Sequence, residues 1–490
     1  MSAAAAMPAG EKTFMGQPRA LVTLFLTEMW ERFSFYGMRA ILVLFLAAPE
    51  SDGGLGFSVA EAAALYGLYN ALVYVAALPG GWVADHITGA RKAVLYGGIV
   101  IAIGHFTMAL PGTAPIYVGL LLIILGTGLL KPNMSAMVGR LYADDDPRRD
   151  SGFSIFYMGI NLGALLAPLI CGYLGQEVNW RLGFAAAGVG MTLGLLQYWI
   201  GVRSMGDIGT EPGQRLKDHE RSKILRGVVA GAALGLAVLL FDVLVTEISA
   251  DLIEKVIGVL ILAVPVGYFV MQFRRPELTG TERSRLKALV YLFAASAVFW
   301  ILYCQAGSTL SIFAEDKVND EILGISFPAS FFQSVNPVFI LALAPVMAWL
   351  WIRLGSRQPS TPIKFSLGLL LVGFSFLVMM MAADAAGDGK TSAMWLIGVY
   401  FVQTVGELCI SPVGLSTATK LSPASSVGTT MGIWFLSISA GDVIGGYVAG
   451  LYDEISLGVY FGLLGLLAIA AGVLVVVGSK HIIKLMDGLR

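Results

Sequence analysis

Apolar stretches with almost no charged side chain recur along this sequence from residue 20 to residue 478. Each is about 20 residues long, which is enough for an α-helix to cross the hydrocarbon core of a bilayer. Only 13% of the 490 residues are charged, against about 25% in a typical soluble domain. The chain is therefore predicted to be a polytopic membrane protein, and an ordinary soluble enzyme is excluded.

The spans are predicted to be α-helices, because the alternating apolar and polar residues of a membrane β-barrel are absent. The first 19 residues lack the basic, apolar and small-residue order of a cleaved signal peptide, so the first span is expected to remain in the protein. The prediction is an all-α fold with fourteen transmembrane helices, near residues 20–48, 58–83, 91–110, 115–139, 152–174, 180–202, 227–245, 252–273, 286–314, 328–352, 363–385, 392–419, 424–451 and 457–478.

The predicted helices form a six plus two plus six arrangement. Lys131 and Pro132 in the fourth helix are echoed by Ser411 and Pro412 in the fourth helix of the last six. This echo suggests two repeated bundles, related about an axis along the membrane normal and separated by an inserted hairpin. The expected parts are an N-terminal segment 1–19, a six-helix bundle 20–202, a linker 203–226, a two-helix hairpin 227–273, a linker 274–285, a six-helix bundle 286–478 and a tail 479–490.

The loop charges predict the orientation in the membrane. Most of the 32 Lys and Arg residues fall in loops on the same side as residue 1, and basic loops stay in the cytoplasm. Both termini are therefore expected to be cytoplasmic, in a multi-pass protein of the cytoplasmic (inner) membrane. A formal net charge of −1 gives no reason to expect nucleic acid as a partner, and no residue spacing suggests a metal site.

The first predicted helix carries charges that cannot face lipid. Glu28, Arg32, Phe35, Tyr36 and Arg39 share one helical face, and each ion at mid-membrane costs about 2.5–3.5 kcal/mol on insertion scales. The stripe must therefore meet partners or water inside the protein. One alternative is that Glu28 and Arg32 form a purely structural ion pair, but this pair would leave Arg39 without a partner.

Charges of opposite sign occur in the two predicted halves. Arg39 and Lys131 would give a central cavity a cationic wall, and Glu407 would give it an anionic wall. A zwitterion fits that polarity, with its carboxylate on the cations and its ammonium on the acid. The alternative is a permanent salt bridge between Lys131 and Glu407. Burial penalises the charged form of a carboxyl group, so Glu28, Glu31 and Glu407 are candidates for proton exchange.

Further polar and aromatic side chains are expected to line the cavity. The amides of Asn161 and Asn336 lie within apolar spans, and Ser411 lies one turn from the predicted anionic residue. The aromatic candidates for a pocket that accepts varied side chains are Tyr36, Tyr74, Trp300 and Trp434, although each could equally serve plain packing. Asp442, deep in a late helix, has no evident role.

Three motifs resemble those of a known family. The loop from Gly81 to Lys92 resembles the cytoplasmic loop motif of the major facilitator superfamily. The segment Glu28-x-x-Glu31-Arg32, with the residues up to 37, and the segment 153–164 are similar to signatures of the proton-coupled oligopeptide transporter family. Together with the helix number and the hairpin, the resemblance covers the whole chain and favours the bacterial form of the family.

This resemblance implies a major facilitator fold and the import of di- and tripeptides with protons. It further implies that Arg39 and Lys131 hold the peptide carboxylate, and that Glu407, Asn161 and Asn336 hold the amino end. The implied partners are peptides, protons and the lipid bilayer, with no cofactor beyond the coupling proton, and a monomer is expected.

The resemblance also implies that Glu28, Glu31 and Arg32 link protonation to alternating access. Two positions depart from the family pattern. Phe35 replaces a tyrosine, which removes one hydroxyl group, and Gly67 stands where animal relatives carry a histidine. Proton coupling is therefore expected to use carboxylates.

Two alternatives remain open from the sequence. Asp316, beside Glu315, is expected to close an extracellular gate with Arg39, although the two acids could instead form a solvated loop. The same fold could carry nitrate or another small anion on Arg39 and Lys131. Glu407 argues against that cargo, because a carboxylate in the cavity repels a bare anion.

Overall fold

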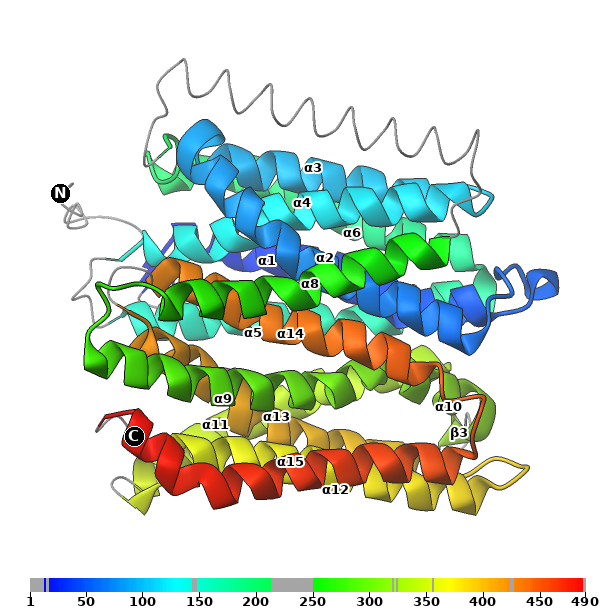
Figure 1. Cartoon of the computed structure of the whole chain (residues 1–490). Coiled ribbons are helices and arrows are strands. Elements are labelled where there is room, and N and C mark those ends of the chain that lie inside the picture. The colour runs from blue at the N-terminus through cyan, green and yellow to red at the C-terminus, as the bar shows by residue number, and fades with distance from the viewer. Residues whose placement is uncertain are drawn as a thin grey trace.

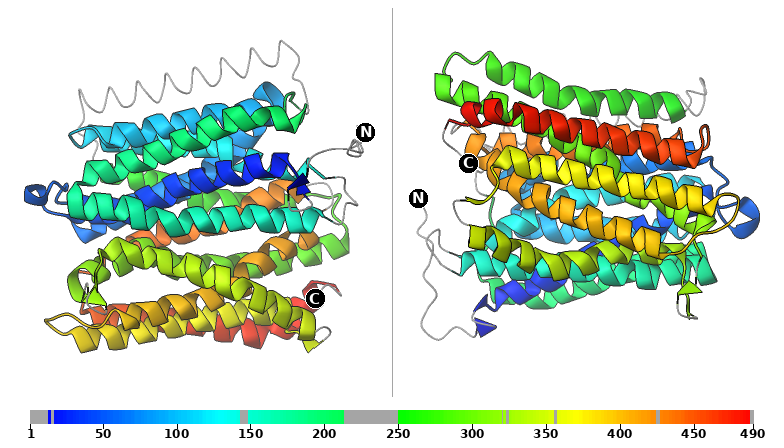
Figure 2. Two further views of the ribbon diagram at one scale, coloured as in Figure 1. Left: turned by 180° about the vertical axis from the view of Figure 1, so that it is seen from behind. Right: turned by 90° about the horizontal axis from the view of Figure 1, so that it is seen from below.

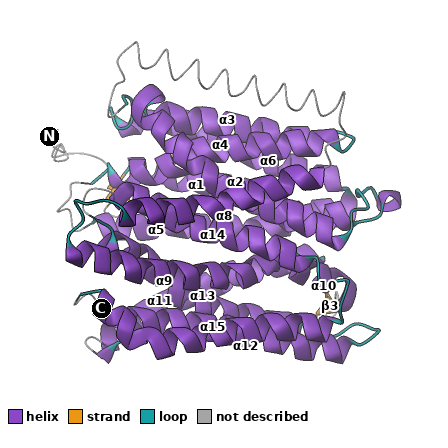
Figure 3. Ribbon diagram, in the orientation of Figure 1, coloured by secondary structure: helices purple, strands orange, loops and turns teal. Residues whose placement is uncertain are grey.

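The structure is a computed structural model of the whole chain. It describes residues 13–14, 17–142, 148–212, 250–319, 321–322, 325–354, 357–423 and 427–487. These residues are almost entirely helical, with four two-residue strands in two small hairpins at 13–18 and 321–326 (Figure 3). The predicted all-α architecture is confirmed for this part of the chain.

Six long helices and several short ones occupy residues 20–205. The long helices are α1 (Ala20–Ala47), α2 (Val59–Val83), α3 (Ala90–Met108), α4 (Ala114–Gly139), α5 (Arg149–Ala167) and α6 (Trp180–Gly201). The short ones are η1 (Glu50–Asp52), η2 (Ala84–Thr88), η3 (Pro168–Gly172), η4 (Leu174–Val178) and η5 (Val202–Met205). Their order follows the predicted spans.

The second part of the chain begins with α8 (Ala250–Phe273), which corresponds to the second helix of the predicted hairpin. The hairpin's first helix, 227–245, lies outside the described residues. The remaining helices are α9 (Gly280–Tyr303), η7 (Cys304–Gly307), α10 (Thr309–Lys317), η8 (Ala329–Ser334), α11 (Val335–Leu354), α12 (Thr361–Ala386), α13 (Met394–Leu421), α14 (Val427–Ala449) and α15 (Leu457–Leu485).

Ten helical stretches among the described residues are long and apolar enough to cross a membrane. They lie in α2, α4, α5 and α6, in the stretch from α9 to α10, and in α11 to α15. Helix α1 is also long, at 28 residues, but its buried charges make it more polar than these spans. Burial of those charges inside the protein offsets the cost of placing them in the membrane.

The long helices run side by side in a bundle (Figure 1). Helix α1 packs on α5 and α6, and α3 packs on α4 and α6. In the second part, α12 packs on α13 and α15. Contacts between the two parts are made by α2 with α14 and by α5 with α11, while α8 lies against both α2 and α14. The start of α1 and the end of α15 lie at the same end of the bundle (Figure 2).

Glycines allow the closest helix contacts, as is typical of membrane bundles. A Cβ atom at Gly97 of α3 would lie 2.6 Å from the Gly126 carbonyl oxygen of α4. In the second part, a Cβ atom at Gly373 of α12 would lie 2.8 Å from the Gly465 carbonyl oxygen of α15. Backbones therefore touch at these crossings, and any larger residue would separate the helices.

The span predicted near 286–314 lies within one apolar helical stretch, Gly280–Lys317, but this stretch is not a single continuous α-helix. Helix α9 ends at Tyr303, and the chain passes through η7 before α10 begins at Thr309. The break includes Ser308, whose backbone is not helical (φ −124°, ψ −101°). The break also admits the Tyr66 side chain of α2, because a Cβ atom at Gly307 would lie 1.8 Å from the Tyr66 hydroxyl.

Candidate functional site

A cavity of about 260 Å³ lies between the two parts of the bundle and is lined by seven of the long helices. Its size is near the lower end of the range for small-molecule sites, roughly 300–1,000 Å³. Nine of the predicted site residues line it, namely Tyr36, Arg39, Tyr74, Asn161, Trp300, Asn336, Glu407, Ser411 and Trp434. The structure therefore brings together side chains that are far apart in sequence.

Glu407 of α13 is held by two neutral donors. The Tyr303 hydroxyl donates to its Oε2 at 2.7 Å, and the Asn336 amide donates to the same oxygen at 3.1 Å. The amide also donates to the Thr404 hydroxyl at 2.9 Å, which fixes its orientation. Both bonds to the carboxylate use Oε2, so Oε1 is left for a ligand. A cationic group would donate the strongest hydrogen bond to this carboxylate oxygen.

Arg39 of α1 contributes the positive charge of the cavity lining. Its Nε donates a hydrogen bond to the Tyr66 hydroxyl, and its guanidinium carbon lies 5.8 Å from the ring centroid of Tyr36 and 5.7 Å from that of Tyr66. No acid lies within ion-pair distance of this guanidinium in the described part of the chain. Aromatic faces and a hydroxyl hold it in place, so its remaining donors are left for an anionic group.

Lys131 of α4 lies behind the cavity wall and not in its lining. Its ammonium nitrogen is 4.0 Å from the ring centroid of Tyr74, and this ring lines the cavity. Lys131 and Glu407 both lie in described parts of the chain, and they form no ion pair with each other. The alternative of a permanent salt bridge between them therefore does not hold in this structure.

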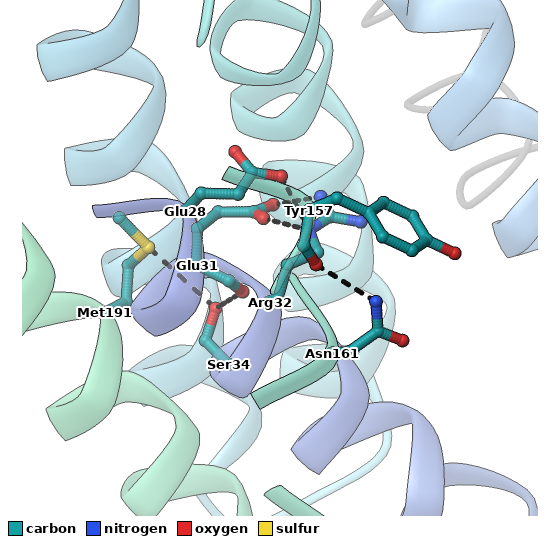
Figure 4. A network of polar contacts seen from close by, with 7 residues as sticks. All are labelled: Glu28, Glu31, Arg32, Ser34, Tyr157, Asn161 and Met191. Carbon is teal, nitrogen blue, oxygen red and sulfur yellow. Dashed lines mark hydrogen bonds and ion pairs between the residues drawn. The ribbon is translucent and has the colours of Figure 1, made fainter. Parts of the chain in front are cut away.

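The acids of the first helix form a separate cluster around Arg32 (Figure 4). Arg32 donates to both oxygens of Glu31, with the longer of these bonds at 2.6 Å, and its Nε lies 3.4 Å from Glu28 Oε1. The predicted pair of Glu28 and Arg32 is thus present, but Glu31 is bound more closely. Glu28 Oε2 is buried without a hydrogen-bond partner. None of the three residues lines the cavity.

Helix α5 closes on this cluster. A Cβ atom at Gly163 would lie 2.3 Å from the Met29 carbonyl oxygen of α1. Two turns earlier on α5, the Tyr157 carbonyl accepts a hydrogen bond at 3.0 Å from Asn161, as Figure 4 shows. Phe35 lies under the Arg32 guanidinium, whose carbon is 5.1 Å from the ring centroid. An aromatic face thus contacts the cation at the position where the family pattern has tyrosine.

Several cavity residues were missed by the sequence analysis. Tyr157, Ser296, Tyr303, Gln333, Tyr400 and Gln403 all line the cavity. Helical spacing could have found some of them, because Tyr157 precedes Asn161 by four residues and Gln403 precedes Glu407 by four. Residues three or four apart share a helix face, so each of these two lies beside a predicted site residue.

The end of the bundle opposite the start of α1 is closed by contacts between η3, η4, η8 and α10. The Gln176 side chain donates to Glu315 at 2.7 Å and accepts from the Ser330 backbone nitrogen at 3.0 Å. A Cβ atom at Gly172 would lie 2.1 Å from the Ser330 hydroxyl oxygen. Exposed Asp316 makes no ion pair with Arg39 among the described residues, so the closing contact in this structure belongs to Glu315.

A metal ion needs a group of ligand side chains that lie close together. Among the described residues, no group of three or more His, Cys, Asp or Glu side chains is placed to hold a metal ion. The three cysteines at 171, 304 and 409 are free and buried.

Residues 91–463 match the model of the POT family. This chain belongs to the POT family, the proton-coupled oligopeptide transporters. It is therefore a transporter and not an enzyme. It is 45% identical over 480 residues to the uncharacterized transporter YclF of Bacillus subtilis (strain 168), covering 98% of this chain and 97% of the relative.

A relative with a stated substrate is similarly close. The chain is 43% identical over 492 residues to a di-/tripeptide transporter of Lactococcus lactis subsp. lactis (strain IL1403), covering 98% of this chain and 99% of the relative. The crystal structure of a peptide transporter POT in complex with sulfate superposes with a TM-score of 0.94, at 43% identity and 98% coverage of both chains. The predicted family is confirmed, and with it the multi-pass membrane architecture.

Proposed function

We propose that this protein imports di- and tripeptides across the cytoplasmic membrane, driven by the inward movement of protons. The observation that carries the proposal is the cavity with Arg39 in one wall and the free Oε1 of Glu407 in another. A peptide is a zwitterion whose charged ends are separated by its backbone. The Lactococcus relative, named a di-/tripeptide transporter, supports this choice of cargo.

The peptide carboxylate binds Arg39, whose planar guanidinium matches a carboxylate with two parallel hydrogen bonds. Lys131 adds positive charge from behind Tyr74, and a small movement of that ring would let it reach the same carboxylate. At the other end, the ammonium group binds Glu407 Oε1 while Asn336 and Asn161 offer amide oxygens. Trp300, Trp434 and Tyr36 surround the side chains, and Ser411 adds a hydroxyl group.

The coupling proton binds in the cluster formed by Glu28, Glu31 and Arg32. One guanidinium cation balances one carboxylate, yet both Glu28 and Glu31 lie against it. The cluster therefore carries one excess negative charge when both acids are ionised, which is costly in a membrane interior. Glu28 has the longer contact and an oxygen without a hydrogen bond, so it takes up the proton. Glu407 is the second proton-exchanging acid, because it faces the cargo directly.

The conformational cycle follows from the arrangement of helices. Two six-helix bundles, 20–202 and 286–478, rock about the central cavity, with the hairpin 227–273 inserted between them. An even number of spans, fourteen, would put both termini on one side of the membrane, and the basic loops favour the cytoplasmic side. The closure at Gln176 and Glu315 then lies outside, so the structure corresponds to a state shut toward the exterior. The protein works as a monomer, with the proton as coupling ion and no cofactor.

A small anion is the second candidate cargo, because the similar peptide transporter was crystallised with sulfate. Arg39 and Lys131 could bind such an ion. The carboxylate of Glu407 in the same cavity opposes it, and an anion would leave Oε1 without a partner. The peptide is therefore preferred.

Uptake into proteoliposomes tests the proposal. Labelled dialanine should accumulate when a proton gradient is directed inward and only equilibrate without the gradient. Glu407→Gln and Lys131→Ala should each abolish the accumulation. A wild type that accumulates no dialanine but transports nitrate would contradict the proposal and support the second candidate.

A further inference from the structure

Asp442 is a buried acid of α14 that has no part in the contacts described above. Its side chain is only 6% exposed. It lies one helical turn beyond Ile438, and that residue lines the cavity. Residues four apart share a helix face. Asp442 therefore lies just past the cavity lining, deeper in the protein.

Close backbone packing fixes this position. A Cβ atom at Gly67 of α2 would lie 2.4 Å from the Asp442 carbonyl oxygen, and one at Gly441 would lie 2.4 Å from the Trp300 Cβ of α9. The backbone of α14 is thus held against α2 at Asp442 and against α9 at Gly441. Neither contact leaves space for the α14 backbone to shift at this position.

The groups around Asp442 include two cations. The charges of Arg39 and Lys131 both act on it, and no hydrogen bond or ion pair is made by its carboxyl group in the parts of the chain that the structure describes. The remaining titratable groups that interact with Asp442 come from α2 and η7 and are Tyr66, Tyr74 and Cys304. An ionised carboxylate without direct partners is costly here, and the charges of Arg39 and Lys131 offset part of that cost.

The pairing of the buried cations indicates which of them Asp442 can neutralise. Arg32 is already occupied by Glu28 and Glu31. Arg39 is left with a neutral hydroxyl as its hydrogen-bond partner. In the absence of cargo, the ionised Asp442 carboxylate is therefore a buried counter-charge for Arg39, in addition to Glu407, on which the Arg39 charge also acts. A peptide carboxylate arriving at Arg39 would supply the same negative charge at shorter range.

We propose that Asp442 is a proton-binding site whose protonation is coupled to the arrival of the peptide carboxylate at Arg39. This inference rests on the proposed function. When the peptide carboxylate binds, two negative charges compete for the same cation, and the more weakly held one takes up a proton. By reciprocity, a proton already on Asp442 leaves Arg39 available and strengthens peptide binding by the same factor. Peptide and proton thus bind together, which is what symport requires.

The test is calorimetric binding of dialanine to the purified full-length protein at alkaline and acidic pH. Repeating each titration in buffers of different ionisation enthalpy gives the protons taken up per bound peptide. Wild type should take up more protons than Asp442→Asn, with the difference approaching about one proton. The variant should also bind dialanine about 5-fold more tightly or better at alkaline pH, at the lower end of typical coupling between sites.

Asp384→Asn is the matched control, because Asp384 is an exposed acid near the end of α12 and should behave as wild type. If Asp442→Asn fails to fold, Asp442→Glu keeps the carboxyl group and should match wild-type proton uptake. Loss of uptake in that variant would overturn the inference. Equal uptake and affinity in Asp442→Asn and wild type would also overturn it. A wild type that binds no dialanine would instead contradict the proposed function, and this inference with it.

Discussion

Replacing Glu407 with glutamine changes the charge of the anionic wall while keeping its shape. In the structure, Tyr303 and Asn336 both donate to Oε2. The glutamine carbonyl oxygen can accept both of these bonds. Its NH₂ group then takes the place of Oε1 and points a donor at the peptide ammonium, so one attraction is replaced by a repulsion.

The size of the effect follows from this geometry. Removing one partner of a buried, hydrogen-bonded charge pair costs about 2–5 kcal/mol. At 1.4 kcal/mol per factor of ten, the dissociation constant of dialanine should rise by about 30-fold to about 4,000-fold. The two preserved hydrogen bonds should keep the thermal stability of Glu407→Gln close to that of wild type.

The assay compares two ligands on two proteins. Binding of dialanine and of its analogue without the amino group, propionyl-alanine, is measured for wild type and Glu407→Gln. Only dialanine should lose affinity in the variant, because only dialanine carries the ammonium group. If both ligands lost affinity equally, the reasoning would be refuted and Glu407 would be a structural residue.

Two further predictions concern helix packing and closure. Gly67→Ala should lower the thermal stability in detergent by overpacking worth about 1–3 kcal/mol, since its Cβ would lie 2.4 Å from the Asp442 carbonyl oxygen; Gly398→Ala, where nothing lies within 4 Å, should not. An unchanged melting temperature for Gly67→Ala would contradict the observed packing. Gln176→Ala removes two hydrogen bonds of about 1 kcal/mol each and should favour outward opening by about 30-fold. With the other two cysteines removed, an impermeant thiol reagent should label Cys171 faster from outside, and an unchanged rate would argue against this closure.

Much of the helical architecture could be predicted from hydropathy, because each membrane helix must satisfy its own backbone hydrogen bonds. The break after Tyr303 could not. It is a tertiary feature, set by the Tyr66 side chain that enters against Gly307. The apolar run 288–314, around the break, contains no proline or charge to signal it.

Individual residues show why the site was only partly predictable. The stripe on α1 identified Arg39 because an isolated charge in an apolar span demands a partner. The sequence placed Lys131 in the cavity wall, but the distance to Tyr74 shows that an aromatic ring covers it. The substitution at Gly67 was visible in the sequence. Its reason, the close approach of α14, required the fold.

The residue that closes the predicted extracellular gate was also not predictable from the sequence. Glu315 and Asp316 are adjacent acids, and the sequence alone gives no means of choosing between them. In the structure Glu315 accepts a hydrogen bond from Gln176 and Asp316 does not, although both acids are exposed. Which side chain faces across an interface depends on how the two parts of the bundle meet, and local sequence does not encode that.

The central claim is that a peptide is held by its two charged ends between Arg39 and Glu407. The most direct test is an experimentally determined structure of the protein with dialanine bound. The account predicts the peptide carboxylate within hydrogen-bond distance of the Arg39 guanidinium and the ammonium within hydrogen-bond distance of Glu407 Oε1. Dialanine bound in the reverse orientation, or outside this cavity, would contradict it.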